Sequence, residues 1–137
     1  MTDVTPETPR PAIAAAIITL NNRVLMVRRR VSEGSLSWQF PAGEVEPGET
    51  PLEAAAREAN EETGVTVAEG KLLGERVHPK TGRTMIYVAF NHIEGQASVA
   101  DDEELDSIAW VSRGELPEYV PYGFFEPVQT HLDGKLS

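Results

Sequence analysis

A run of carboxylates carries the clearest chemical potential of this sequence. Between Glu44 and Glu62 there are seven glutamates and a single basic residue, Arg57. If residues 52–62 form a helix, Glu58, Glu61 and Glu62 lie one turn apart and share one face. Carboxylates at this spacing repel one another unless water or a cation separates them. The cluster therefore indicates either a solvated acidic helix face or a site for a divalent cation.

The residues around the cluster favour the cation. Residues 40–43 and Pro47-Gly48 are turn-forming, so they place an irregular loop before the helix, where backbone carbonyls can add ligands. Oxygen ligands of this kind suit Mg²⁺ or Mn²⁺. The sequence has no cysteine and three histidines, which disfavours zinc and excludes disulfides, thiolate metal sites and cysteine nucleophiles.

The segment from Gly43 to Val65 resembles the signature box of the Nudix hydrolases, the MutT-like family. The family pattern is G-x5-E-x7-R-E-U-x-E-E-x-G-U, where U is an apolar residue. Val65 fills the last apolar position, whereas Ala59 is small for the other one. The box covers 23 of 137 residues, and its fixed positions are all filled at the right spacing, by Gly43, Glu49, Arg57, Glu58, Glu61, Glu62 and Gly64.

This resemblance implies roles for the residues of the box. It makes Mg²⁺ the expected cofactor, with Mn²⁺ as a substitute. The implied ligands are Glu58, Glu61, Glu62 and a carbonyl near Gly43. Arg57 would orient the glutamates through charge-assisted hydrogen bonds, and its alternative role is a surface ion pair with Glu61. Either Glu61 or Glu58 would act as general base, so Glu61, Glu58 and Arg57 are the expected catalytic residues.

Two weaker candidates lie outside the box. Arg28, Arg29 and Arg30 end the second expected strand, and Arg29 corresponds to a substrate-contacting arginine of MutT-like relatives. Residues 101–104 form an acidic run, of which Glu104 is the preferred candidate for substrate or metal contact. Both features have a plain surface role as their alternative. Four aromatic residues are candidates for stacking a base, although each also suits the core: Trp38, Phe40, Tyr87 and Trp110. The three histidines are assigned no role.

The resemblance implies hydrolysis of a nucleoside diphosphate linked to some group X. Cleavage of a nucleoside triphosphate to a nucleoside monophosphate and pyrophosphate is the reaction that we expect. Three alternatives stay open: hydrolysis of ADP-ribose or a nucleotide sugar, hydrolysis of a dinucleoside polyphosphate, and nucleotide sensing by a non-catalytic domain. A cation among the glutamates would explain how an acidic protein accepts an anionic substrate.

Composition limits the partners. Twelve basic and 22 acidic residues give a formal net charge of −10, which argues against nucleic-acid polymers and anionic membranes as partners. The apolar run over residues 12–20 is too short to span a bilayer. With no export signal visible, we expect a cytoplasmic protein that binds a small nucleotide, and a homodimer stays open.

The order of apolar, polar and turn-forming residues predicts the helices and strands that position these side chains. Residues 1–11 are expected to form a flexible tail, and residues 12–137 a single Nudix hydrolase domain. Strands are expected at residues 12–20, 23–30, 38–40, 72–77, 84–92 and 107–111, with a polar loop at residues 32–37. Thr50, Pro51 and Glu53 predict the start of a helix that Gly64 ends, and a second helix is expected within residues 125–133. This order predicts an α/β (α+β) fold, and the resemblance specifies a Nudix-like α/β/α sandwich around a mixed β-sheet.

Overall fold

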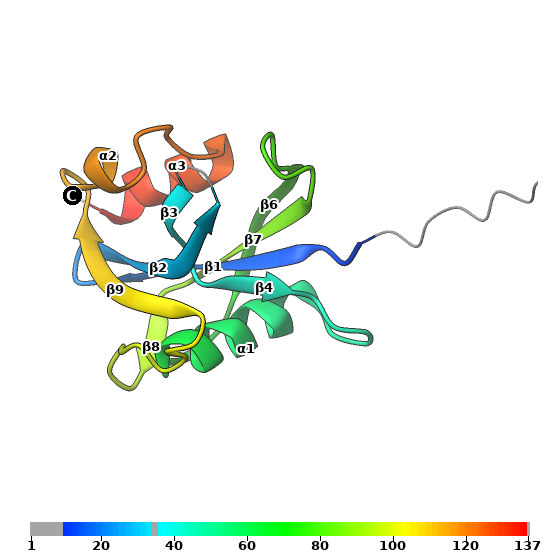
Figure 1. Ribbon diagram of the computed structural model, residues 1–137. Coiled ribbons are helices and arrows are strands. Elements are labelled where there is room, and N and C mark those ends of the chain that lie inside the picture. Colours follow the sequence, from blue (N-terminus) through cyan, green and yellow to red (C-terminus); the bar gives the residue numbers. More distant parts are fainter. Residues whose placement is uncertain (1–9, 34–35, 137) are drawn as a thin grey trace, which may run out of the picture.

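The computed structural model describes residues 10–33 and 36–136 of the chain. Its largest element is a mixed sheet of seven strands (Figure 1). Five strands follow the order β3-β2-β1-β7-β6, while β4 pairs with β1 and β9 pairs with β2. These strands are β1 (Ile13–Leu20), β2 (Arg23–Glu33), β3 (Leu36–Gln39), β4 (Ala42–Glu44), β6 (Lys71–Val77), β7 (Thr84–Phe90) and β9 (Leu105–Ser112).

The sheet divides at the junction of β1 and β2. These two strands meet at the turn formed by Asn21 and Asn22, which both adopt a positive φ, as asparagine tolerates. Away from the turn, the start of β1 pairs with β4 instead of β2. Strand β1 also pairs in parallel with β7, whereas the other pairs are antiparallel. One part of the sheet therefore holds β4, β1, β7 and β6, and the other holds β3, β2 and β9.

Helices cover both faces of the sheet. Helix α1 (Pro51–Thr63) lies on one face, and α2 (Leu116–Tyr119) and α3 (Glu126–Lys135) lie on the other (Figure 1). Successive side chains of β1 point to opposite faces of the sheet and so contribute to a hydrophobic core on each face. Ala14, Ala16 and Ile18 pack toward α1, while Ala15 and Ile17 pack toward α3. This arrangement confirms the predicted sandwich around a mixed sheet.

Several short elements were not predicted. The sequence pattern missed β4, α2, and the small separate sheet of β5 (Thr66–Ala68) and β8 (His92–Glu94). The polar loop expected at residues 32–37 is wrong at both ends, because β2 extends to Glu33 and β3 begins at Leu36. Strands of three residues depend on a partner strand, which local patterning does not reveal.

Most of the expected tail, residues 1–9, lies outside the described residues, so the proposed domain boundaries remain a prediction. In the part of the chain that the structure describes, no helix is long and apolar enough to cross a bilayer.

Candidate functional site

Helix α1 begins and ends where the sequence predicted. The Thr50 side chain accepts a hydrogen bond from the Glu53 backbone N–H, and the Glu53 carboxylate accepts one from the Thr50 N–H, which completes the capping box. Pro51 occupies the first turn. Gly64 ends the helix with a φ of 80°, a left-handed conformation that favours glycine. The carboxylates therefore stand on a helix with both ends stabilised.

Small side chains bring this helix close to the sheet. Ala54, Ala55 and Ala59 are completely buried and pack with Ala14 and Ala16 of β1. Ala59, small for its place in the box pattern, therefore occupies a position where the helix approaches β1. The close approach also buries Glu62, which is 3% exposed.

Glu58 and Glu62 lie at the interface between α1 and the end of β4. The Glu58 side chain is 13% exposed and the Glu62 side chain 4%. A Cβ added at Gly43 would overlap the Glu58 carboxylate, so any larger residue at position 43 would displace it. Glycine at position 43 therefore leaves room for the Glu58 carboxylate to lie against the backbone.

The two buried carboxylates are electrostatically unfavourable without a cation. Burial raises the pKa of Glu62 above its usual range, and the neighbouring Glu58 raises it further while Arg29 lowers it. Burial likewise raises the pKa of Glu58, against the opposing effect of Arg57. The Glu62 Oε1 atom is buried and has no hydrogen-bond partner among the residues that the structure describes. An unpartnered buried carboxylate oxygen beside a second carboxylate fits the binding of a hard divalent cation.

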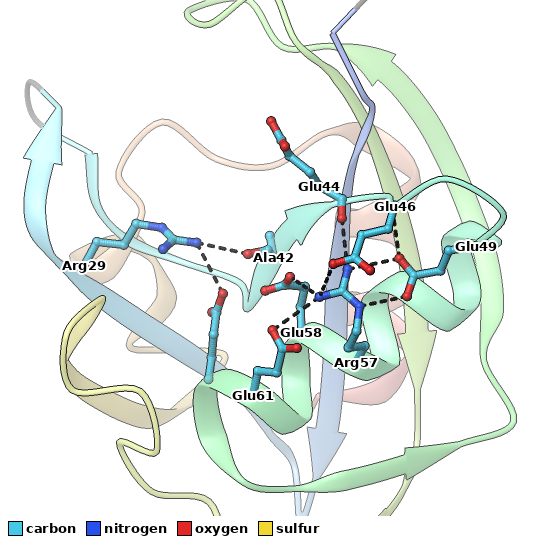
Figure 2. Close-up of polar contacts among 9 residues, drawn as sticks. Arg29, Ala42, Glu44, Glu46, Glu49, Arg57, Glu58 and Glu61 are labelled. Carbon is cyan, nitrogen blue, oxygen red and sulfur yellow. Dashed lines mark hydrogen bonds and ion pairs between the residues drawn. The ribbon is translucent and has the colours of Figure 1, made fainter.

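Arg57 connects the helix to the preceding loop. Its Nε and Nη2 donate to the two Glu49 carboxylate oxygens at 2.8 and 3.0 Å, and Nη2 also donates to the Glu44 carbonyl at 3.0 Å. Its Nη1 donates to Glu58 at 2.7 Å and to Glu61 at 3.2 Å (Figure 2). The pair with Glu61 is the predicted surface contact, but it is one of several. Arg57 therefore orients Glu58 and Glu61 while holding the loop against the helix.

Glu61 occupies a more open position than the other two glutamates. Its side chain is 53% exposed, and Arg57 holds it toward Glu58 (Figure 2). Among the described residues, no group of three acidic or histidine side chains is already arranged to hold a metal ion. The structure thus brings Glu58 and Glu62 together and leaves Glu61 beside them, linked through Arg57.

Arg29 enters the site from β2. Its guanidinium donates to the Ala42 carbonyl at 3.0 Å (Figure 2). It also donates to Glu62 at 3.4 Å and to Glu104 at 3.0 Å. Its neighbours point elsewhere: Arg28 pairs with Asp106 and Arg30 donates to the Asp102 carbonyl. Of the three consecutive arginines, Arg29 is the one that reaches the carboxylates.

The loop that carries Glu104 is fixed to the end of α1. Ser98 N–H donates to the Thr63 carbonyl, and Ala100 N–H donates to the Glu62 carbonyl at 3.0 Å. At the other end of the loop, the Glu104 carbonyl accepts a hydrogen bond from Arg30 N–H. The acidic run therefore borders the carboxylate site, with the Glu104 side chain 60% exposed.

A pocket of about 520 Å³ opens beside the carboxylates on the α3 side of the sheet. Arg29, Ala42 and Gly43 line its end nearest α1, and strands from both parts of the sheet contribute to it. Phe40 and Tyr87 line the pocket while belonging to the core, and Trp38 lies at its edge against Tyr119. Trp110 packs in the other core, toward α1. The further aromatic lining residues are Tyr122, Phe124 and Phe125.

The β6–β7 hairpin adds basic residues that the sequence analysis missed. Arg76, His78 and Lys80 all line the pocket. They recur at every second position, and this alternation in an acidic chain was the available signal. From the sequence alone, none of these three residues has an expected role.

Comparisons with known proteins agree with this architecture. The model of the NUDIX domain family matches residues 8–128. The RNA pyrophosphohydrolase of Halorhodospira halophila is 45% identical over 129 residues, covering 88% of this chain and 70% of that protein. The CTP pyrophosphohydrolase of Escherichia coli is 28% identical over 108 residues, covering 78% and 79% of the two chains. The solved structure of a MutT NUDIX hydrolase from Burkholderia pseudomallei matches with a TM-score of 0.68 at 20% identity. The match covers 96% of this chain and 100% of the other, so the two chains share the same fold.

Proposed function

The chain belongs to the NUDIX domain family, and we propose that this Nudix hydrolase cleaves nucleoside triphosphates to a nucleoside monophosphate and pyrophosphate. One relative is named for a nucleoside triphosphate, as a CTP pyrophosphohydrolase. The box residues Arg57, Glu58, Glu61 and Glu62 all stand on the same helix beside a pocket with aromatic walls. The pocket has the size and lining that suit a nucleoside.

The observation that carries this proposal is the buried pair of Glu58 and Glu62. Burying two carboxylates side by side destabilises a fold unless a cation or hydrogen-bond donors replace their lost hydration. The unpartnered Glu62 Oε1 and the glycine that makes room for Glu58 both indicate a cation-binding role. Perturbed, buried carboxylates at a pocket are also typical of functional sites.

Nudix hydrolases generally use divalent metals, and the residues present fit one. We propose Mg²⁺, with Mn²⁺ as a substitute, held by Glu58, Glu62 and the backbone near Gly43, with Glu61 as a further ligand. Carboxylate and carbonyl oxygens are the ligands that these hard ions prefer. When bound, the cation supplies positive charge against the substrate phosphates.

The remaining groups suit proton transfer and substrate binding. Glu61 is open to water and lies beside the buried pair, so it is our first candidate for the general base, with Glu58 as the second. Arg57 keeps both carboxylates in place. Arg29 lies where it can exchange its exposed partner Glu104 for a substrate phosphate. A guanidinium can bind a phosphate through two parallel hydrogen bonds.

A nucleotide panel tests the proposal. Purified protein is incubated with Mg²⁺ and each nucleoside triphosphate, deoxynucleoside triphosphate, ADP-ribose and diadenosine tetraphosphate, and the products are separated by ion-exchange chromatography. We expect monophosphate and pyrophosphate from at least one triphosphate. Turnover of ADP-ribose or the dinucleoside polyphosphate alone would assign the hydrolase to another substrate class. Binding of nucleotides without any turnover would identify a sensor.

A further inference from the structure

The pocket beside the carboxylates has a charge opposite to that of the protein. The chain has 12 basic and 22 acidic residues. Among the described residues that line the pocket, however, four are lysine or arginine and none is acidic; the four are Arg29, Arg76, Lys80 and Arg83. A cavity lined by one sign of charge concentrates ligands of the opposite sign. The pocket therefore suits an anionic ligand. Its four cations differ in whether they pair with carboxylates.

Two of these cations already have carboxylate partners. Arg29 pairs with Glu62 and Glu104, and Arg83 pairs with Glu44 at 2.9 Å. Arg76 and Lys80 differ from them, since in the described ranges neither has a carboxylate within 4.0 Å. Within residues 10–33 and 36–136, the hairpin thus presents two cations whose charge no ion pair offsets.

Aromatic rings hold both cations over the pocket. The Arg76 guanidinium carbon lies 5.8 Å from the centre of the Tyr87 ring and 5.2 Å from that of Phe125, and its Nε donates to the Tyr87 hydroxyl at 3.2 Å. The Lys80 ammonium lies 4.2 Å from the centre of the Tyr122 ring. A cation over an aromatic face keeps its charge and its remaining N–H donors available to an anion.

The sheet register places Arg76 across the pocket from the carboxylates, and Lys80 lies in the turn that follows β6. Ile13 pairs with Glu44 on one side and with Met85 on the other, and Met85 pairs with Arg76. Arg76 therefore lies three strand spacings, about 14 Å, from the backbone of Glu44, the neighbour of Gly43. With its 5′-phosphates at the carboxylate end, as the proposed function requires, a nucleoside between these ends presents its opposite side to the hairpin.

We propose that Arg76 and Lys80 bind a phosphate on the 3′ side of the nucleoside, so that the enzyme prefers 5′-phosphorylated nucleotides that also carry a 3′-phosphate group. This inference rests on the proposed function, because it takes the carboxylate end as the site of the 5′-phosphates. The guanidinium offers a planar pair of donors to the phosphate oxygens, and the ammonium adds a point charge. The 3′-phosphate is either a free monoester or the phosphodiester of a longer nucleotide.

Equilibrium binding separates this inference from the catalytic proposal. Isothermal titration calorimetry at low salt compares adenosine 3′,5′-bisphosphate with adenosine 5′-monophosphate, and the guanosine pair likewise, without any turnover. We expect the bisphosphate to bind about tenfold more tightly or better, a difference that shrinks as salt screens the charges. The dinucleotide pApA, compared with the monophosphate, tests the phosphodiester. Tighter binding of the bisphosphate or of pApA than of the monophosphate supports the site. The ligand that binds more tightly shows whether the site accepts a phosphate monoester or a phosphodiester.

Variants locate the effect. Arg76→Gln/Lys80→Gln is expected to bind bisphosphate and monophosphate equally well. The matched control is Lys71→Gln/Lys135→Gln, which removes two exposed charges outside the pocket and should keep the preference. Lys80→Gln alone alters an exposed side chain and should lose part of the preference, which keeps the test valid if the double variant does not fold.

Equal binding of all three ligand types by the wild-type protein, or an undiminished preference in Arg76→Gln/Lys80→Gln, would overturn the inference. Absence of hydrolysis with an intact preference would instead reject the catalytic proposal.

Discussion

At the scale of single residues, Arg57 carries an unusual share of the contacts in the site. It bonds to Glu49 and the Glu44 carbonyl in the loop and to Glu58 and Glu61 on the helix. Glu49 and then Glu58 raise the pKa of the arginine above its ordinary value, so its charge is retained at any working pH. A fixed charge among carboxylates offsets their repulsion and keeps the loop in place when no cation is bound.

Glu61→Gln tests the proposed base. Glutamine keeps the shape and helix propensity of glutamate but cannot accept a proton, so we expect turnover to fall by about 10²- to 10⁴-fold. The melting temperature should change little, because the side chain is 53% exposed. Glu118→Gln, at an exposed position of α2, is the control and should retain full activity. Turnover within a few-fold of wild type, with Glu58→Gln inactive, would transfer the base role to Glu58.

Glu49 gives the site a defined response to acid. The hydrogen bond from Arg57 lowers its pKa from 4.5 to about 2. A carboxylate with a lowered pKa stabilises the fold above its unfolded pKa and loses this contribution as pH falls toward the folded value. Wild type should therefore exceed Glu49→Gln in free energy of unfolding at pH 7, and the difference should shrink between about pH 4.5 and 2. Urea unfolding across this range measures it, and a difference that does not vary with pH would contradict the assigned pair.

At the scale of elements, α1 depends on its two ends. Gly64 has a φ of 80°, which any other side chain adopts with strain, so Gly64→Ala should destabilise the protein by about 1–2 kcal/mol. Gly134 lies within α3, where an added Cβ meets nothing. Gly134→Ala should therefore stabilise the protein slightly, by up to about 1 kcal/mol. Thermal unfolding of both variants checks the prediction, and equal effects of the two substitutions would contradict the cap.

Helix α1 and the long strands were predictable because their signals are local. The capping box, Pro51 and Gly64 specify the helix within one segment, and the apolar run of β1 specifies a buried strand. Strand β4 was not predictable in this way. It exists because residues 42–44 pair with Ile13, Ala14 and Ala15, a contact set by the divergence of β1 from β2. This pairing is also what places Gly43 against Glu58.

At the scale of the whole molecule, the candidate site combines segments that are distant in the sequence. The box residues were predictable from their spacing, since one helix carries them. The hydrogen bonds of Arg29 with Ala42, Glu62 and Glu104 join β2, β4, α1 and the loop before β9, and no local pattern reveals such contacts. Likewise, only the fold shows that the basic hairpin lines the far side of the pocket.

Cation binding should stabilise the entire fold. A ligand that binds the folded state alone raises stability by mass action, by about 2.7 kcal/mol at one hundred times its dissociation constant. Mg²⁺ or Mn²⁺ should therefore raise the melting temperature of protein first treated with a chelator. The shift should be lost in Glu62→Gln and kept in Glu118→Gln. An equal shift in wild type and Glu62→Gln would place the cation elsewhere.

In the proposed reaction, water attacks the phosphorus nearest the sugar of a nucleoside triphosphate at the Glu58–Glu62 end of the pocket. Hydrolysis of the best triphosphate from the panel in oxygen-18 water, followed by mass spectrometry of the products, tests it most directly. We expect one labelled oxygen in the nucleoside monophosphate and unlabelled pyrophosphate. Label in pyrophosphate, or labelled orthophosphate beside a nucleoside diphosphate, would contradict it.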